Sequence, residues 1–221
     1  MIKAIIIDLD DTLIDTTEQL SESWKKALCR VLTQRTGQPL LIVGDTVERF
    51  IKEHSYTAKY TKACCEHFNL NPVMISEEIY RVIDLSSLQL SHDAKKFLGH
   101  IQGYEVYLVT TGSKILQGRK LQHLGLRFHF IELYDESEGG NKAPLFKKVL
   151  QKYRPEEAIC IGDNIRSEIS AANSLGIRTI RILKGKRKDL QPANYLEKPV
   201  HTVHTLMEAA AIIQHIQKQA A

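Results

Sequence analysis

The expected fold follows from one stretch near the start of the chain, Ala4-Ile5-Ile6-Ile7-Asp8-Leu9-Asp10-Asp11-Thr12. Four apolar, mostly β-branched residues are typical of a short parallel strand that is buried on both faces, and Asp8 marks its end. Asp8 and Asp10 are two positions apart, so on an extended backbone their carboxylates face the same side. One cavity would then hold both acids beside a cation that offsets their repulsion. The alternative is a helix-capping Asp-Asp-Thr cluster after the strand.

The composition indicates an ordinary globular protein. The chain has 221 residues, of which 43% are hydrophobic, enough to bury a core as one domain with an insertion or as two small domains. The 30 Lys and Arg residues outnumber the 26 Asp and Glu residues only slightly, so the net charge of +4 indicates neither nucleic acid nor membrane binding. Four cysteines without CxxC spacing indicate a reducing compartment. No apolar segment is long enough to span a bilayer, and we expect a cytoplasmic protein.

The apolar pattern divides the chain into a helical block and an α/β part. Between about residues 17 and 90, apolar residues recur at helical spacing and are interrupted by Gly, Pro and Asn, which predicts three to five helices. We therefore expect a core domain formed by residues 1–15 and 91–221, and an inserted helical domain formed by residues 16–90.

Beyond residue 90, strand and helix patterns alternate. The expected elements are a helix at 93–101, a strand at 106–109, a helix at 115–124, a strand at 128–133, a helix at 144–153, a strand at 158–161, a helix at 165–175, a strand at 177–183 and a helix at 206–217. This alternation predicts an α/β fold with a doubly wound parallel sheet, in which ligands bind outside the carboxyl ends of the strands. Asp8, Thr110 and Asp163 all fall at those ends.

These three residues and one lysine form a pattern suited to phosphate chemistry. Lys142 lies in the Gly-rich connection at 139–144. Carboxylates bind a hard cation, while hydroxyl and ammonium groups donate hydrogen bonds to phosphate. Together the four residues predict a phosphoryl-transfer site. Taken singly, Thr110 is equally consistent with a helix cap and Lys142 with a solvated loop.

Four motifs in this order resemble the haloacid dehalogenase superfamily, specifically its phosphatases with an inserted helical cap of the C1 type. The DxDxT signature is Asp8-Leu9-Asp10-Asp11-Thr12, the hydroxyl of the second motif is Thr110, the lysine is Lys142, and the acidic fourth motif runs from Gly162 to Glu168. The resemblance spans about residues 2 to 183. It implies a Rossmann-like core domain and a cap that selects the substrate.

The resemblance also implies a role for each motif. Asp8 would be the nucleophile that forms an aspartyl-phosphate, and Asp10 would protonate the leaving oxygen and then activate water. Magnesium would be held by Asp8, the backbone carbonyl of Asp10 and Asp163. The phosphate would be held by the Thr110 hydroxyl, the N–H groups of Thr111 and Gly112, and Lys142.

Glu168 departs from the family pattern, because many relatives carry a second Asp in the fourth motif. Its longer side chain would reach the metal through a water or bind Lys142, and the alternative is a surface acid. Asn164 would close the turn beside the metal. Arg166 would either face solvent or contact the phosphate side of the substrate.

The remaining candidates concern specificity and charge. Thr16, Thr17 and the stretch His54-Ser55-Tyr56-Thr57 are candidate substrate contacts, although structural roles account for them more simply. The run from Lys184 to Lys188 most simply forms a short solvated loop.

The sequence therefore predicts a magnesium-dependent phosphatase that acts on a small phosphorylated metabolite, with no nucleic acid or membrane partner. A phosphomutase acting on a sugar phosphate is the alternative within the same fold, and a catalytically idle binding protein is the alternative from another class. A nucleic-acid end phosphatase rests only on the basic run. A dehalogenase is disfavoured, because carbon–halogen displacement needs no acid such as Asp10. The sequence names neither the individual substrate nor an oligomeric state.

Overall fold

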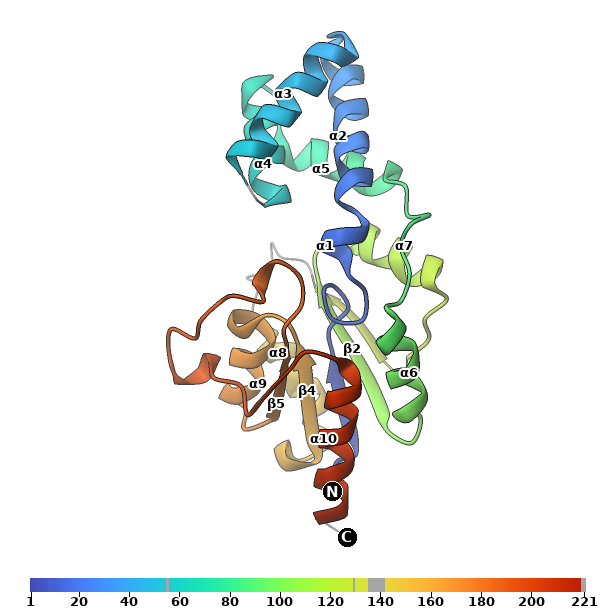
Figure 1. The fold of residues 1–221 in the computed structure, drawn as a ribbon, viewed down its shortest axis with the longest axis vertical. Coiled ribbons are helices and arrows are strands. Elements are labelled where there is room, and N and C mark those ends of the chain that lie inside the picture. Colours follow the sequence, from blue (N-terminus) through green and yellow to red (C-terminus); the bar gives the residue numbers. More distant parts are fainter. Residues whose placement is uncertain (55, 129, 135–141, 220–221) are drawn as a thin grey trace. The chain divides into compact units, whose positions relative to one another are not determined.

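The computed structural model describes residues 1–54, 56–128, 130–134 and 142–219, which fall into two compact units. One unit combines Met1–Thr17 with Gln89–Ala221 and has an α/β architecture (Figure 1). The other unit, Glu18–Leu88, is helical. In the described part of the chain, no helix is long and apolar enough to cross a membrane.

The α/β unit is built on one parallel sheet. Within the described residues it has six strands in the order β3-β2-β1-β4-β5-β6. Their bounds are β1 Ala4–Ile7, β2 Glu105–Thr111, β3 Phe130–Tyr134, β4 Ala158–Gly162, β5 Arg178–Ile182 and β6 His201–Val203. The strand order reverses beside β1, whose two neighbours are β2 and β4. In doubly wound sheets, ligands bind at this reversal point, outside the carboxyl ends of the strands.

Strand β1 is central because every one of its side chains is buried. Ala4 and Ile6 point to one face of the sheet, where they pack with Phe146 and other residues of α8 and α9. Ile5 and Ile7 point to the opposite face, which α6 and α10 cover (Figure 1). Burial on both faces explains why the strand reads as an uninterrupted apolar run.

The helices of the two units follow the predicted pattern closely. Their bounds are α1 Thr16–Gln19, α2 Ser21–Thr36, α3 Leu40–Glu53, α4 Thr57–His67, α5 Pro72–Val82, α6 His92–His100, α7 Lys114–Leu124, α8 Ala143–Val149, α9 Ser170–Ser174 and α10 Leu206–Gln219. Local chemistry fixes several ends. Asn71 caps α5 by accepting from the N–H groups of Val73 and Met74, and Pro72 occupies its first turn.

Three details of the predicted elements were wrong. The segment Ile165–Ile169 is a π-helical turn and only Ser170–Ser174 is α-helical, because the Asn164 carbonyl accepts from Ile169 N at 3.3 Å. Helix α8 ends at Val149 rather than at residue 153, ahead of the Arg154-Pro155 pair. Strand β6 was not predicted, because three residues are too short for a periodic signal.

Candidate active site

Three neighbouring strands bring the polar residues of the sequence motifs to one edge of the sheet. Asp8 follows β1, Thr110 lies near the end of β2, and Asp163 follows β4. All three side chains are buried. The backbone N–H of Asp8 donates to Ile161 O at 3.1 Å, which extends the β1–β4 pairing by one residue. The juxtaposition therefore follows from the strand register alone.

Lys142 lies beneath this edge and is completely buried. Its ammonium group donates to Asp8 Oδ1 at 2.6 Å and to Val109 O at 3.0 Å, and its Nζ lies 2.5 Å from Glu168 Oε1. An ammonium group has three N–H donors, and each has a protein acceptor here. Most of the Gly-rich connection that precedes Lys142, residues 139–141, lies outside the described residues.

Glu168 is buried and faces the site, so its interpretation as a surface acid was wrong. Besides contacting Lys142, it accepts from the backbone N–H of Asn164 at 3.0 Å through Oε2. The fold requires glycine at position 162, because a Cβ there would lie 2.7 Å from Glu168 Cγ. Asn164 closes the turn, since its side chain accepts from Arg166 N, while Arg166 itself is exposed.

The acids around Lys142 outnumber the buried cations. Burial raises the pKa of Asp8, and Glu168 adds to the rise against the opposing effect of Lys142. Burial also raises the pKa of Asp163, with further repulsion from Glu168 and Asp8. For Lys142, burial opposes the charged form, but Asp8 and Glu168 hold its pKa above the usual range. The cluster therefore has an excess of negative charge that a cation would neutralise.

Asp10 has a different environment from Asp8. Its Oδ1 accepts from Lys120 Nζ at 2.6 Å and from the Thr16 hydroxyl, and its Oδ2 accepts from Gln117 Nε2 at 2.6 Å. Burial opposes ionisation of Asp10, but Lys120 and these hydrogen bonds outweigh it and lower its pKa. Asp10 is thus a half-buried carboxylate that donors hold on both oxygens.

Comparison with known proteins identifies the family. The haloacid dehalogenase-like hydrolase family matches residues 2–176. The chain belongs to this family. A glyceraldehyde 3-phosphate phosphatase of Methanocaldococcus jannaschii is 27% identical over 236 aligned positions, covering 99% of this chain and 100% of the relative. One from Pyrococcus furiosus is also 27% identical, covering 99% and 94%.

A solved structure agrees with the family assignment. A haloacid dehalogenase-like family hydrolase from Streptococcus pneumoniae superimposes with a TM-score of 0.67 at 22% identity, covering 96% of this chain and 99% of that one. This likeness concerns the fold. The predicted family and the predicted α/β Rossmann-like core are confirmed.

Two candidate substrate contacts of this haloacid dehalogenase-like hydrolase instead bind the acids of its first motif. The Thr16 hydroxyl donates to Asp10, and Thr17 donates to Asp11 from its backbone N–H at 2.9 Å and from its hydroxyl at 2.7 Å. Asp11 has a positive φ of 55°, a conformation that Asp tolerates better than most residues. These contacts fix the loop that follows β1. Of the other candidate stretch, 54–57, residue 55 lies outside the described residues.

The basic run of the hydrolase was misjudged as a solvated loop. Arg187 Nη1 lies 3.5 Å from Asp163 Oδ2, and Lys184 Nζ lies 3.2 Å from Asp93 Oδ1. Gly185, with φ +60°, approaches Asp11 so closely that a Cβ would lie 2.2 Å from Asp11 Oδ2. The single glycine within the cationic run is the feature of the sequence that corresponds to this close approach.

Sequence reasoning also missed Gln117 and Lys120, which α7 presents to Asp10. Their signal is the spacing of three positions on the helix that follows the Thr110 strand, which places both on one helical face. A polar pair on a helix usually faces solvent, so this spacing alone does not mark a site.

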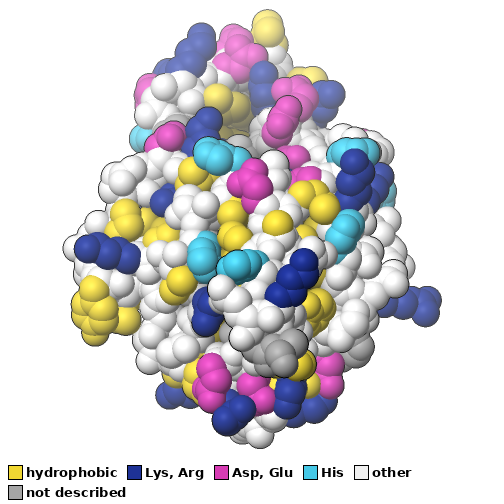
Figure 2. Space-filling view, turned by 60° about the horizontal axis from the view of Figure 1, so that its bottom comes forward, with side chains coloured by type: hydrophobic (Ala, Val, Ile, Leu, Met, Phe, Trp, Pro, Cys, Tyr) yellow, Lys and Arg dark blue, Asp and Glu magenta, His cyan; other side chains and the backbone are white. Residues whose placement is uncertain are grey.

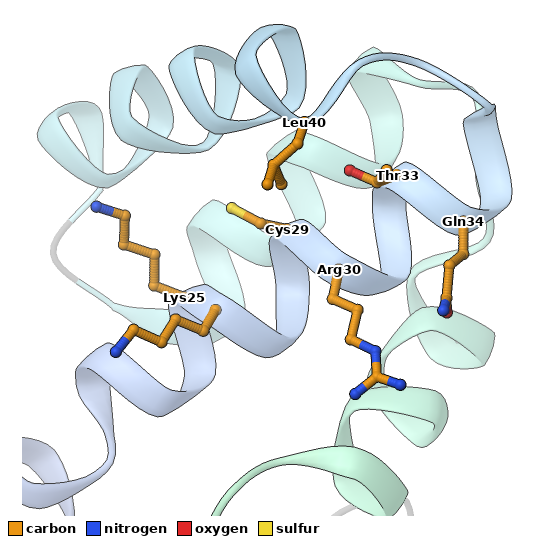
Figure 3. A pocket seen from close by; sticks show the side chains of 7 residues that line it. Lys25, Cys29, Arg30, Thr33, Gln34 and Leu40 are labelled. Carbon is orange, nitrogen blue, oxygen red and sulfur yellow. The ribbon is translucent and has the colours of Figure 1, made fainter.

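The helical unit contains a cavity of its own. Its volume is about 500 Å³, and it lies between α2 and α3 (Figure 3). The lining residues are Lys25, Lys26, Cys29, Arg30, Thr33, Gln34 and Leu40. Lys25 already pairs with Glu48 at 2.8 Å. None of the predicted catalytic residues lines this cavity.

One face of the hydrolase carries charges of both signs (Figure 2). On the face shown in Figure 2, Lys and Arg side chains are interspersed with Asp and Glu side chains. This distribution agrees with the small net charge of +4. On that face, the described residues form no extended cationic surface suited to a nucleic-acid backbone.

Proposed function

We propose that this protein is a magnesium-dependent phosphatase that hydrolyses a phosphate monoester of a small sugar-like metabolite through an aspartyl-phosphate on Asp8. The observation that carries the proposal is the pair of acids at the end of β1. Asp8 is bound by a buried lysine, whereas Asp10 is bound by separate donors from α7. This difference supports attack by one acid and proton transfer by the other.

Asp8 would act as the nucleophile. Lys142 holds Asp8 Oδ1 at 2.6 Å, which orients the carboxylate and leaves Oδ2 for attack on phosphorus. Because the three ammonium donors of Lys142 already have acceptors, its main contribution is to orient and neutralise Asp8. A phosphate oxygen would have to share one of these donors. The Thr110 hydroxyl and the backbone N–H groups of Thr111 and Gly112 would bind the other phosphate oxygens.

Asp10 would transfer the proton. When the ester bond breaks, its carboxylic acid would protonate the leaving oxygen, and the resulting carboxylate would accept a proton from the water that attacks the aspartyl-phosphate. Without substrate its pKa is low. A bound phosphate ester brings negative charge near Asp10, which favours protonation before the first step.

The donor set fits magnesium. Within the described residues, no group of three or more His, Cys, Asp or Glu side chains is arranged to hold a metal ion. Magnesium requires fewer protein ligands, because it keeps several waters and binds one or two carboxylates plus a phosphate oxygen. Asp8 and Asp163, with the Asp10 carbonyl, would supply these ligands. The ion would neutralise the buried acids and the charge on the transferred phosphoryl group.

The substrate class follows from the full-length relatives. Two of them are named for glyceraldehyde 3-phosphate, so we propose a short phosphorylated sugar as the substrate. The helical residues 16–90 would act as the cap that selects it. This cap role, its C1 type and a cytoplasmic location stay predictions.

A substrate panel tests the proposal. Free phosphate is measured from glyceraldehyde 3-phosphate, glycerol 3-phosphate, phosphoserine and glucose 1-phosphate, each with magnesium, with EDTA and with the Asp8→Asn variant. We expect release that requires both magnesium and Asp8, with the three-carbon sugar phosphate preferred. An isomerised sugar phosphate without free phosphate would indicate a mutase. Release that is undiminished in Asp8→Asn would overturn the mechanism.

A further inference from the structure

Helix α7 has an unusual polar inner face. It follows β2 directly, and its residues Gln117 and Lys120 are only 2% and 3% exposed. Residues three positions apart on a helix lie on the same face. Burial of an amide and an ammonium group is unfavourable unless both are paired. The nitrogen donors of both side chains contact the same group, the carboxylate of Asp10, whereas Gln117 Oε1 has no partner among the described residues.

The two contacts hold different oxygens of Asp10. Lys120 Nζ donates to Oδ1 and Gln117 Nε2 donates to Oδ2, each at 2.6 Å. With the Thr16 hydroxyl also donating to Oδ1, donors on both oxygens fix the plane of the carboxylate, which a single contact would leave free to rotate. Both donors come from one helix, α7.

Gln117 also joins Asp10 to the phosphate side of the site. Its Nε2 lies 2.9 Å from Thr110 Oγ1 and 2.9 Å from Thr111 O. Nε2 has only two hydrogens, so these two oxygens and Asp10 Oδ2 share them. The reversed amide would place Oε1 against a carboxylate and a carbonyl, which is unfavourable. One amide thus sets the distance between Asp10 and Thr110.

We propose that Lys120 and Gln117 are positioning residues that aim the Asp10 carboxyl at the leaving oxygen of the phosphate ester. This inference rests on the proposed function. In the first step the Asp8 Oδ–P bond forms, the P–O ester bond breaks, and the proton of Asp10 moves to the departing alkoxide. A p-nitrophenolate leaves without that proton. The two side chains should therefore matter for alkyl esters and much less for p-nitrophenyl phosphate.

The test compares kcat/KM for glyceraldehyde 3-phosphate and for p-nitrophenyl phosphate, since this constant reports the first step and is insensitive to breakdown of the aspartyl-phosphate. General acid catalysis contributes about 10²–10⁴-fold. We expect kcat/KM of Lys120→Met to fall by about 30-fold or more with the alkyl ester and by less than about threefold with the aryl ester. The difference is the part of general acid catalysis that depends on Lys120. Lys120→Arg should restore part of the ratio. Gln117→Leu should change the ratio in the same direction.

Exposed residues provide matched controls. Gln122→Leu changes the same helix, and Lys95→Met makes the same substitution on α6; neither should change the ratio. Circular dichroism and thermal unfolding establish whether each variant folds. If Lys120→Met does not fold, the test uses Gln117→Leu instead. Equal losses with both esters, no loss, or failure of both variants to fold would overturn the positioning role. A parent enzyme that hydrolyses neither ester would instead refute the proposed function, and the inference would fall with it.

Discussion

Asp8 and Asp10 lie two residues apart, yet their surroundings shift their pKa values in opposite directions. Burial raises the pKa of Asp8 to about 7, because Lys142 lowers it by less than burial and Glu168 raise it. Asp10 meets the cation Lys120 without a competing buried acid in contact, and its pKa falls below the usual range despite burial. Their lysine partners lie more than a hundred residues further along the chain. Tertiary contacts thus give two identical side chains different chemistry.

Removing the carboxylate of Asp8 should reduce activity more than any other change at the two acids. The amide of Asp8→Asn cannot attack phosphorus, so we expect phosphate release to fall by on the order of 10³-fold or more. Steady-state kinetics with the best substrate of the panel measures this loss. Asp45→Asn, an exposed position in α3, is the matched control and should retain full activity.

Removing the cation beside Asp8 should have the next largest effect. Lys142→Met removes the cation that contacts Asp8 and Glu168, so the ionised form of Asp8 loses a stabilising charge and its carboxylate loses its orientation. We expect kcat/KM to fall by about 10²-fold or more, by analogy with loss of an oriented electrostatic partner. The exposed Lys147→Met on α8 provides the control. Equal effects of the two variants would refute the role of Lys142.

Replacing Glu168, which lies on the Asp8 side of the site, should change the magnesium requirement of the enzyme. Glu168→Gln keeps the shape but removes a charge that stabilises Lys142 and sits near Asp163. We expect the magnesium requirement to rise by about tenfold, the lower end of what outer-shell changes cost. A magnesium titration of activity measures the shift. An unchanged titration would separate Glu168 from the site.

Magnesium should stabilise the folded protein by an amount that depends on pH, because Asp8 and Asp163 would bind it. The pKa values of Asp8 and Asp163 are raised in the folded state, so the folded protein holds their protons at a pH where the unfolded chain has released them. The contribution of Asp8 to stability is therefore lost as pH rises from about 4 through about 7, and the contribution of Asp163 is also lost as pH rises. A cation that binds the ionised acids offsets this loss, and at low pH it must displace protons.

The corresponding measurement is thermal unfolding with and without magnesium. At about 100 times its Kd, magnesium should raise Tm by about 5–10 °C near pH 7.5, and by less near pH 5. Asp163→Asn should abolish the increase. A magnesium effect that is the same at both pH values, or that survives in Asp163→Asn, would contradict the assignment of these acids to the metal.

Apart from β6, the strands and the polar residues at their ends were predictable, because a buried parallel strand leaves a local apolar run that polar residues end. Ile5 to Ile7 followed by Asp8 is such a signal. The predicted phosphatase class agrees with the family match and the full-length relatives. These parts depend on short-range patterns or on motifs.

The partners of Asp10 were not predictable from the sequence. Gln117 and Lys120 are polar helix residues of the kind that usually face solvent. They are buried because α7 packs against β3 and directs both side chains to Asp10. The contact of Arg187 with Asp163 was also not predictable, because a basic run usually faces solvent. The π-helical turn at Ile165–Ile169 depends on the carbonyl of Asn164 and the buried position of Glu168, neither of which has a periodic signature.

Chemical trapping of the phosphorylated enzyme tests the division of labour between Asp8 and Asp10 most directly. The Asp10→Asn variant is mixed with p-nitrophenyl phosphate, which needs no proton to leave, and is quenched with borohydride, which reduces an aspartyl-phosphate to homoserine. Peptide mass spectrometry then locates the modified residue. We predict homoserine at position 8, accumulating because the base for the second step is missing. Modification at another residue, or turnover with none at position 8, would contradict the account.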